Sequence, residues 1–597
     1  MVYIQRHIPS ANRIYQMNID NMTGGLNNRS QQMEDNEALN LLNMSFEDDS
    51  LMRKRDGTKY FLQNTSEEPE KVVFLDEYKP YEATPLLVQA TESAIYLDGV
   101  YLSGVEGQIS GVNYRGMYMY CDGTGLYSYG YYHQTEDVYN KITGTPIDDY
   151  VLVEVKNPGV PGVDYTPLGT EHKRGILRIN YTTYTIQYEP CELEVADTYR
   201  GANTVPEGAT QILVHQDMIF VAGMDIENTE IYMSEVRNPF YFPVKTIEQL
   251  PPTSDAIRGM IVYDDSIIVG RQYDIHALTI RMDLQSAFVD ASLRKLNAHT
   301  GVASGRAMQN AHNFLFYLGS DGNAYALSGV KYDEKVLVTQ PLTKNIDLKK
   351  DPIGFELVEF ESAIGCFFDD KWYLQIKEKT LVYSYKHRAW TVYSGLHAHA
   401  WLNYNFKLIW SDHEGSIREF DNTTFLDVGA PYKSIWKSKR FYMNSPSLIK
   451  YFKEFFFVLR AFENHNSVVD VLFEVDYDSA SSKVEVSSQL SVWGKSKWGD
   501  LFINRSINES MPVLVSRRGR NINITLSNGY EVVGEVDLID DLNDFPGRIE
   551  GVVVYCLEDS GYYHYTDREW VKRDSEFFNQ QMMVYQINGD YEERRKR

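Results

Sequence analysis

Neighbouring carboxylates are the first residues that could do chemistry in this sequence. They occur at four places, Asp148/Asp149, Asp264/Asp265, Asp369/Asp370 and Asp540/Asp541. Two carboxylates can serve as general acid and general base, as in glycoside hydrolysis. Adjacent residues of a strand point to opposite faces, however, and Asp in a turn bonds its own backbone. We therefore predict that the pairs at 264–265 and 369–370 shape turns and that the chain has no catalytic residues.

Two histidines could hold a metal ion. His397 and His399 are spaced to share one face of a strand, but no third ligand lies nearby in sequence, so we interpret them as a structural pair. Ser320-Asp321-Gly322 is only superficially similar to the Ser-x-Asp-x-Gly-x-x-Trp box of sialidase-type propellers, because the spacing differs. HExxH, P-loop, GxSxG and dinucleotide-binding motifs are missing. We predict no metal site and no cofactor.

The composition favours a β-rich globular chain. The 597 residues are 13% aromatic and include 44 tyrosines, and aromatic residues favour half-buried strands. The four cysteines lie far apart and form no CxxC pair, so we expect buried free thiols at Cys121, Cys191, Cys366 and Cys556.

The charge balance limits the classes of partner. Lys and Arg number 58 and Asp and Glu number 83, which gives a net charge of −25. A protein that holds nucleic acid by charge needs a basic surface, whereas a duct through which DNA slides does not. No apolar run approaches the ~20 residues of a membrane helix, and the first 20 residues lack the apolar core of a signal peptide.

A weak repeat positions most of these residues. An alternating segment, a turn centred on Asp or Asn and an apolar strand recur at intervals of 35 to 57 residues, at Asp217, Asp265, Asn313, Asp370 and Asn405. About four short strands per unit is typical of a β-propeller, whose blades bury their faces against one another. We predict a propeller of six to eight blades with insertions over residues 63–428; unrelated antiparallel hairpins are the alternative.

The rest of the chain divides into three further parts. Residues 1–62 are predicted to form an extended N-terminal arm, with a short helix capped by Asp35 or Asn36 and a hairpin that turns at Asp56-Gly57. Eight or nine strands over residues 429–573 predict a second, β-sandwich-like platform domain. Residues 574–597 end in a charged run and are expected to be a solvated or partner-bound extension.

The most specific pattern lies in the first sixty residues. It joins a Gly-Gly turn, an Asn-rich segment and a basic run before Gly-Thr, at Gly24, Gly25, Asn27, Asn36, Arg53, Lys54, Arg55 and Gly57. This opening resembles that of the tail nozzle proteins of tailed bacteriophages, the tubular tail protein B type, also called tail-hub or stabilisation proteins. Fainter similarity follows at 231–242, 255–259 and 435–441.

The resemblance implies a structural virion protein that is not an enzyme. Proteins of this family combine a propeller with a platform domain and assemble as a ring of six copies below the portal and adaptor. The genome passes through the ring during ejection, and fibres or spikes attach outside it. The resemblance thus implies a tail location after synthesis in the host cytoplasm, transient passage of double-stranded DNA and no membrane insertion.

Two other functions remain open from the sequence. One is a virion-associated propeller glycosidase or depolymerase that acts on host surface polysaccharide, and the other is a receptor-binding propeller. For the eight motif positions we expect an assembly arm that wraps a neighbouring copy. A solvated, charged turn is the alternative for Arg53, Lys54 and Arg55.

The arm hypothesis gives a direct test. Deleting residues 1–58 is expected to impair assembly of the virion without unfolding the repeat region, because an arm that wraps a neighbour contributes little to its own core. Electron microscopy of virions and circular dichroism of the shortened chain would measure both effects. Normal virions from the deletion would contradict the hypothesis.

Overall fold

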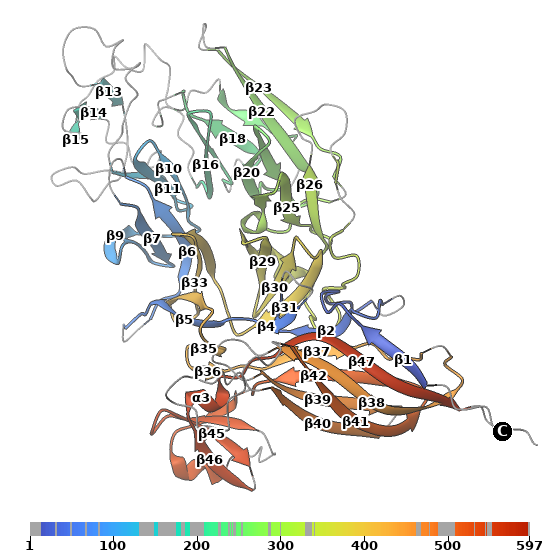
Figure 1. Cartoon of the computed structure of the whole chain (residues 1–597). Helices are drawn as coiled ribbons and strands as arrows, with labels where there is room; N and C mark the ends of the chain where they lie inside the picture. Colours follow the sequence, from blue (N-terminus) through green and yellow to red (C-terminus); the bar gives the residue numbers. More distant parts are fainter. Residues whose placement is uncertain are drawn as a thin grey trace, which may run out of the picture.

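Strands make up nearly all the regular structure, which confirms the predicted mainly β class (Figure 1). The computed structural model describes residues 14–29, 33–47, 51–65, 69–80, 84–130, 149–152, 175–180, 185–190, 208–224, 228–236, 239, 242, 246–251, 255–283, 288–298, 300–328, 337–338, 341–443, 445–460, 467–476, 478–486, 508–530, 532–543, 545, 552–566 and 568–594. Within these described residues the helical turns are η2 (Gly305–Ala307), η3 (Leu357–Ser362), η4 (Ile539–Asn543) and α3 (Ser575–Phe578). Over these residues no helix could span a lipid bilayer.

Seven antiparallel sheets follow one another through the middle of the described chain. The first sheet consists of β6 (Val72–Tyr78), β7 (Leu86–Thr91), β8 (Ala94–Leu97) and β9 (Val100–Gly104), and the second of β10 (Ser110–Tyr114), β11 (Met117–Cys121) and β12 (Leu126–Gly130). The third sheet consists of β16 (Gln211–His215), β17 (Met218–Ala222), β18 (Glu230–Met233) and β19 (Glu248–Gln249). The fourth consists of β20 (Gly259–Tyr263), β21 (Ser266–Gly270), β22 (Ile275–Asp283) and β23 (Phe288–Lys295). A separate sheet of β13 (Asp149–Leu152), β14 (Gly175–Asn180) and β15 (Thr185–Pro190) lies between the second and third in sequence.

The last three sheets complete the series. They are β24 (Gln309–Ala311), β25 (Phe314–Leu318), β26 (Ala324–Ser328) and β27 (Leu337–Val338); β28 (Ile364–Phe368), β29 (Lys371–Ile376), β30 (Lys379–Ser384) and β31 (Ala389–Ser394); and β32 (Ala400–Tyr404), β33 (Lys407–Ser411) and β34 (Ile417–Asp421) with β5 (Gly57–Leu62) from the N-terminal part. The fourth strand of the seventh sheet therefore comes from more than 350 residues away, with Phe420 beside Thr58.

Neighbouring sheets bury their faces against one another. The first strand of each sheet lies beside the first strand of the next, and β32 of the seventh sheet lies beside β6 of the first. Buried apolar clusters bridge the same pairs: Ile95 and Tyr120 share one, and Leu75 and Ile409 share the cluster that leads from the seventh sheet back to the first. A single four-stranded sheet leaves both faces exposed to water, so this burial needs a neighbour on each side.

Two-residue left-handed turns join the first and second strands in six of the seven sheets. The predicted turn residues Asp217, Asp265, Asn313, Asp370 and Asn405 all have φ between 48° and 61°. Such turns match the right-handed twist of the flanking strands, and Asp and Asn tolerate the left-handed conformation better than most residues do. The turn interpretation of the carboxylate pairs at 264–265 and 369–370 is thereby confirmed.

A tyrosine hydroxyl links successive sheets next to these turns. The first strand ends in Tyr in four sheets, and each hydroxyl donates to a carbonyl of the following sheet. The bonds are Tyr78 to Gly116 (3.0 Å), Tyr114 to Asp217 (3.2 Å), Tyr263 to Asn313 (2.6 Å) and Tyr404 to Pro85 (3.5 Å). The last bond joins the seventh sheet to the first, as the apolar cluster of Leu75 and Ile409 does.

After β35 (Leu426–Asp427) and β36 (Ala430–Pro431) the chain enters two large sheets that lie below the seven in Figure 1. One extends the sixth sheet by β2 (Ala38–Leu42), β37 (Ser434–Ser438), β42 (Ile522–Asn528), β39 (Ser467–Val475) and β40 (Asp478–Val486). The other holds β3 (Met44–Phe46), β4 (Met52–Lys54), β47 (Met583–Arg594), β38 (Ile449–Arg460) and β41 (Asn508–Gly519), with β1 (Ile14–Ile19) on β47. Phe455 and Phe457 of one sheet pack on Phe473 of the other, within one core cluster.

A small sheet follows, at the lower left of Figure 1. It consists of β43 (Val532–Val536), β44 (Val553–Cys556), β45 (Gly561–Thr566) and β46 (Glu569–Arg573), and β43 and β44 are parallel. Val553, Phe578 and Leu426 form a cluster that connects this sheet to the segment following the seventh sheet. The region predicted as one platform domain at 429–573 thus contains parts of two large sheets and one small sheet.

The predicted helix and hairpin near the N-terminus are wrong. Residues 38–42 form strand β2, which pairs with β31 and β37, because its apolar side chains fit a sheet between two partners better than an isolated helix turn. The residues on either side of Asp56-Gly57 do not pair with each other. β4 pairs with β3 and β47, whereas β5 pairs with β34 and β35.

The C-terminal part is not the predicted extension. β47 pairs with β38 along its length and also with β1 and β4, and its residues Val584, Ile587 and Tyr591 are buried. A deletion of residues 1–58 would remove β1 to β4 and the start of β5, so the structure predicts loss of folding rather than a selective assembly defect. The free-arm prediction is wrong for these residues because their strands are paired inside the chain.

The exposed turn at Phe406 provides a test of left-handed strain. Phe406 has φ of 61° and its side chain is fully exposed at 101%. A left-handed conformation costs an L-residue roughly 1–2 kcal/mol, and Gly avoids this cost. Phe406→Gly should therefore stabilise the fold by about 1 kcal/mol in urea unfolding. Phe406→Ala, the control, removes the same ring but keeps the strain; equal effects of both changes would refute this explanation.

Candidate functional site

Arg55 is the centre of the junction between the seven sheets and the two large sheets. Its side chain is only 1% exposed, and its Nη1 lies 2.8 Å from Oδ1 of Asp427, 372 residues away in sequence. The guanidinium also donates to Asn43 and to the Ser394 carbonyl, and it stacks 3.9 Å from the ring centre of Tyr432. Removing one partner of such a buried pair leaves the other charge uncompensated, at a cost of about 3–5 kcal/mol.

Lys54 and Arg53 flank this junction in different ways. Lys54 is fully buried, with Nζ 4.2 Å from the centre of the Tyr432 ring and 3.4 Å from the Gln580 carbonyl. Burial, together with the charge of Arg55, lowers the pKa of Lys54 to about 7. Arg53 is partly exposed and pairs with Glu47 and Asp56.

The Gly-Gly turn and the Asn-rich segment pack against each other. A Cβ at Gly24 would lie 2.6 Å from the Asn36 carbonyl oxygen, and Gly25 has φ of +81° and contacts Ala389 of β31. Asn27 Nδ2 donates to Glu37 at 2.8 Å. These contacts fix the segment before β2 against the edge of the sixth sheet.

Gly57 permits another close approach. A Cβ there would lie 2.3 Å from the Leu426 carbonyl oxygen, so only glycine allows β5 to run between β34 and β35. The eight motif residues thus form internal joints. The alternative of a solvated turn is wrong for Lys54 and Arg55, and an interface with another copy cannot use these two buried side chains.

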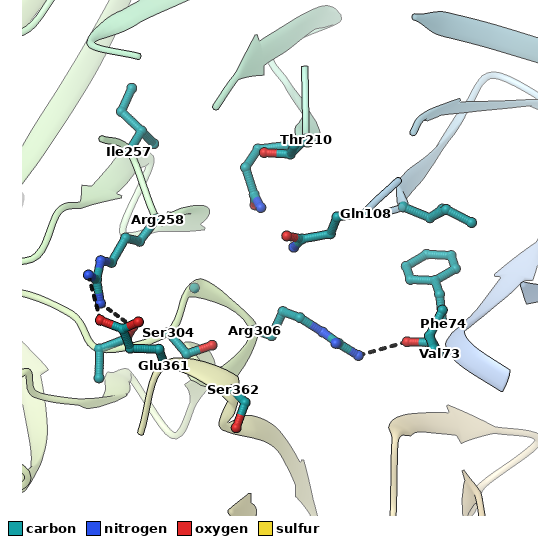
Figure 2. Close-up of a pocket in the computed structure, with 14 residues that line it drawn as sticks. Val73, Phe74, Gln108, Thr210, Ile257, Arg258, Ser304, Arg306, Glu361 and Ser362 are labelled. Carbon is teal, nitrogen blue, oxygen red and sulfur yellow. Dashed lines mark hydrogen bonds and ion pairs between the residues drawn. The ribbon is translucent and has the colours of Figure 1, made fainter. Parts of the chain in front are cut away.

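A cavity of about 560 Å³ lies where the first strands of the sheets begin. Its walls come from six sheets or the segments before them: Val73, Phe74, Gln108, Ile109, Thr210, Gln211, Ile257, Arg258, Ala303, Ser304, Gly305, Arg306, Glu361 and Ser362. Figure 2 shows Arg258 turned toward Glu361 at one side, Arg306 directed across to Val73, and Gln108 pointing into the middle.

Two glycines bring the arginines into this cavity. A Cβ at Gly259 would lie 2.3 Å from Cα of Gly305, so the backbones before β20 and β24 touch. Arg258 precedes this contact and pairs with Glu361 at 3.0 Å, while Arg306 follows it. Arg306 Nη2 donates to the carbonyls of Val73 (2.8 Å) and His399 (2.9 Å), so this side chain crosses the cavity to the point where the first and seventh sheets meet (Figure 2).

Basic side chains gather at this end of the sheets. Burial lowers the pKa of His399, and the charges of Lys71, His413, His397 and Arg306 lower it further. Burial also lowers the pKa of His397, as does His413, whose ring lies 5.6 Å away. The lowered pKa values favour the neutral forms of both histidines, so Lys71 and Arg306 carry the positive charge beside His399.

The other residues proposed for chemistry are dispersed. His397 and His399 precede β32 rather than share a strand face, and within the described ranges no three His, Cys, Asp or Glu side chains gather as for a metal ion. Cys121, Cys366 and Cys556 are buried free thiols, as predicted, and Cys191 lies outside the described residues. Asp148 also lies outside them, while Asp540 and Asp541 belong to η4.

Sequence reasoning missed the cavity arginines and the partners of Arg55. Arg258-Gly259 and Gly305-Arg306 both place arginine beside a glycine just before a first strand, and this pairing was a usable signal. Asp427 and Tyr432 could not be found in this way, because only the folded chain brings them to Arg55.

Comparisons with known proteins add no functional information. No protein-family model and no curated protein matches the sequence. Among solved structures, the computationally designed Ika8 protein is 10% identical with a TM-score of 0.32, over 61% of this chain and 99% of that one. PorZ, from the type-IX secretion system of Porphyromonas gingivalis, is 10% identical with a TM-score of 0.29, over 86% and 53%. AztD from Citrobacter koseri is 13% identical with a TM-score of 0.27, over 59% and 86%.

Lys54 should make stability depend on pH. Its pKa is 10.5 in model compounds and about 7 in the folded chain, so between these values the unfolded chain holds one more proton. Stability should therefore rise as the pH increases from 7 to 10. Lys54→Met removes the titrating group. At pH 6 this variant should unfold at a higher temperature than the native chain, because its free energy of unfolding should be larger by a few kcal/mol.

The control for this prediction is Lys349→Met, a change at an exposed lysine. Thermal unfolding of the three chains between pH 6 and 10 measures the effect. The difference in melting temperature between Lys54→Met and the native chain should become smaller as the pH rises. A difference that stays constant would show that Lys54 does not titrate in this range.

Proposed function

We propose that this chain is a structural subunit of a bacteriophage tail, of the nozzle or hub type, that forms a closed ring with copies of itself. The opening motif carries the proposal, because its resemblance to that family spans residues that also form the main internal joint. In this reading the seven sheets are a seven-bladed β-propeller and the two large sheets are a sandwich-like platform.

The cyclic contacts of the seven sheets support the propeller. The first strands contact one another in sequence and return to the start, and β5 fills the outer position of the last sheet. Closure by a strand from the other end of the series removes an exposed edge that would otherwise pair with foreign strands.

The cavity between the first strands bears on the path of DNA. Arg306 crosses it, and its volume of about 560 Å³ is that of a small-molecule site rather than of a passage for a DNA duplex. A DNA channel in the proposed assembly therefore runs between copies of the chain, not through the propeller of one copy. An acidic wall there would repel the phosphates and reduce adhesion during transit.

A closed ring also needs two different patches on each copy, which meet in a head-to-tail contact. Fibres or spikes would attach outside the ring, and the adaptor below the portal would bind one of its faces. Six copies are expected from the resemblance.

Native mass spectrometry of tails dissociated stepwise tests the proposal. We expect a closed oligomer of this chain, six copies by the family resemblance, to survive after fibres and adaptor are released. A chain that is monomeric in intact tails would contradict the ring. In a parallel arm the purified protein is incubated with host capsule and cell-wall polymers; specific release of new reducing ends would favour the glycosidase alternative and overturn the structural function.

A further inference from the structure

We propose that the cavity at the start of the first strands binds a small organic molecule through a phosphate or carboxylate group, with Arg306 as its main anchor. This inference does not depend on the tail function. It rests on the charge of Arg306, which has no carboxylate partner among the described residues, on the nearby Lys71 and on the polar walls of the cavity.

Arg306 is a cation that lacks a carboxylate partner. Among the described residues it makes no ion pair, and both of its hydrogen bonds go from Nη2 to backbone carbonyls. Its Nε and Nη1 have no acceptor in the described part of the chain. Arg306 is solvent-exposed within the cavity, so its charge is open to an anion that enters from water.

Arg258 shows the contrast within the same cavity. Its guanidinium donates to the Ala303 carbonyl and pairs with Glu361, so its charge is already balanced. The described lining therefore has two guanidinium groups and one carboxylate, which leaves one positive charge. The charges of Lys71 and Arg306 both act on His399, so Lys71 adds to the positive potential beside the cavity.

The geometry favours an oxyanion over a bare halide. Arg306 Nη2 already donates to two carbonyls, so Nε and Nη1 remain as donors to the several oxygens of a carboxylate or phosphate. Gln108 and Gln211 add amide groups, and Ser304 and Ser362 add hydroxyls to the same walls. Such neutral groups suit the hydroxyl or carbonyl substituents of an organic ligand.

The size of the cavity indicates a molecule larger than a simple ion. At about 560 Å³ it lies within the range of roughly 300–1,000 Å³ that is common for small-molecule sites. Phe74, Ile109 and Ile257 add apolar surface to the same walls. A ligand with one anionic end and a short polar or apolar body would fit these walls.

Titration calorimetry on the full chain tests the proposal with two probes, inorganic phosphate and malonate. Sodium chloride at matched ionic strength separates site binding from general screening. We expect saturable binding of at least one probe, and the stronger of the two identifies the phosphate or carboxylate class. If neither probe gives a heat or a rise in melting temperature beyond that of sodium chloride, the proposal is wrong.

Variants locate the site. Arg306→Gln should weaken probe binding at least tenfold, and Arg306→Lys should weaken it less, because the charge remains while the Nε and Nη1 donors are lost. Arg281→Gln removes one charge from an exposed arginine of β22 outside the cavity lining and should leave binding unchanged. Equal binding by Arg306→Gln and Arg281→Gln would overturn the assignment.

A second variant covers the case in which Arg306→Gln fails to fold, since Arg306 also bridges the first and seventh sheets. Gln108→Leu removes an amide from the cavity wall, keeps a similar size and leaves Arg306 in place. It should weaken probe binding about threefold or more without lowering the melting temperature of the unliganded chain. Unchanged affinity in this variant would place any binding outside the cavity and contradict the proposal.

Discussion

In the proposed propeller the last sheet must join the first, and the position of β5 depends on one buried ion pair. Arg55 lies two residues before β5 and meets Asp427, which follows the seventh sheet. Their contact holds the N-terminal strand against β34 and at the same time anchors β35, where the chain leaves the seven sheets for the large sheets. Because both charges are largely removed from water, each needs the other, and the seven sheets and the large sheets are therefore coupled at this point.

This coupling explains why strands β1 to β5 and β47 are structural rather than free. The N-terminal part supplies a strand to the seventh sheet and others to both large sheets, and β47 is paired on both sides. In the proposed assembly, contacts with other copies would therefore use surfaces that remain after these strands are paired. Arg306 crosses the cavity among the first strands, which supports placing the DNA channel of that assembly between chains.

Features that depend on local chemistry could be predicted from the sequence, whereas features that depend on pairing between distant residues could not. The turns at Asp217, Asp265, Asn313, Asp370 and Asn405 were predicted because a left-handed turn favours Asp and Asn wherever it occurs. Ala38–Leu42 was mistaken for a helix because five residues carry too little periodicity to oppose pairing with β31 and β37. The basic run at 53–55 was recognised as special, but its partner Asp427 and the cavity cation Arg306 are defined only by contacts across hundreds of residues.

Cryo-electron microscopy of intact tails, with this chain fitted into the map, would decide whether the molecule is a ring subunit. Several copies should encircle the DNA path, with the duplex between chains, the seven sheets of each copy intact and Arg55 beside Asp427 within the same copy. A map with a single copy away from the DNA path, or with duplex density through the seven sheets of one chain, would contradict the proposed function.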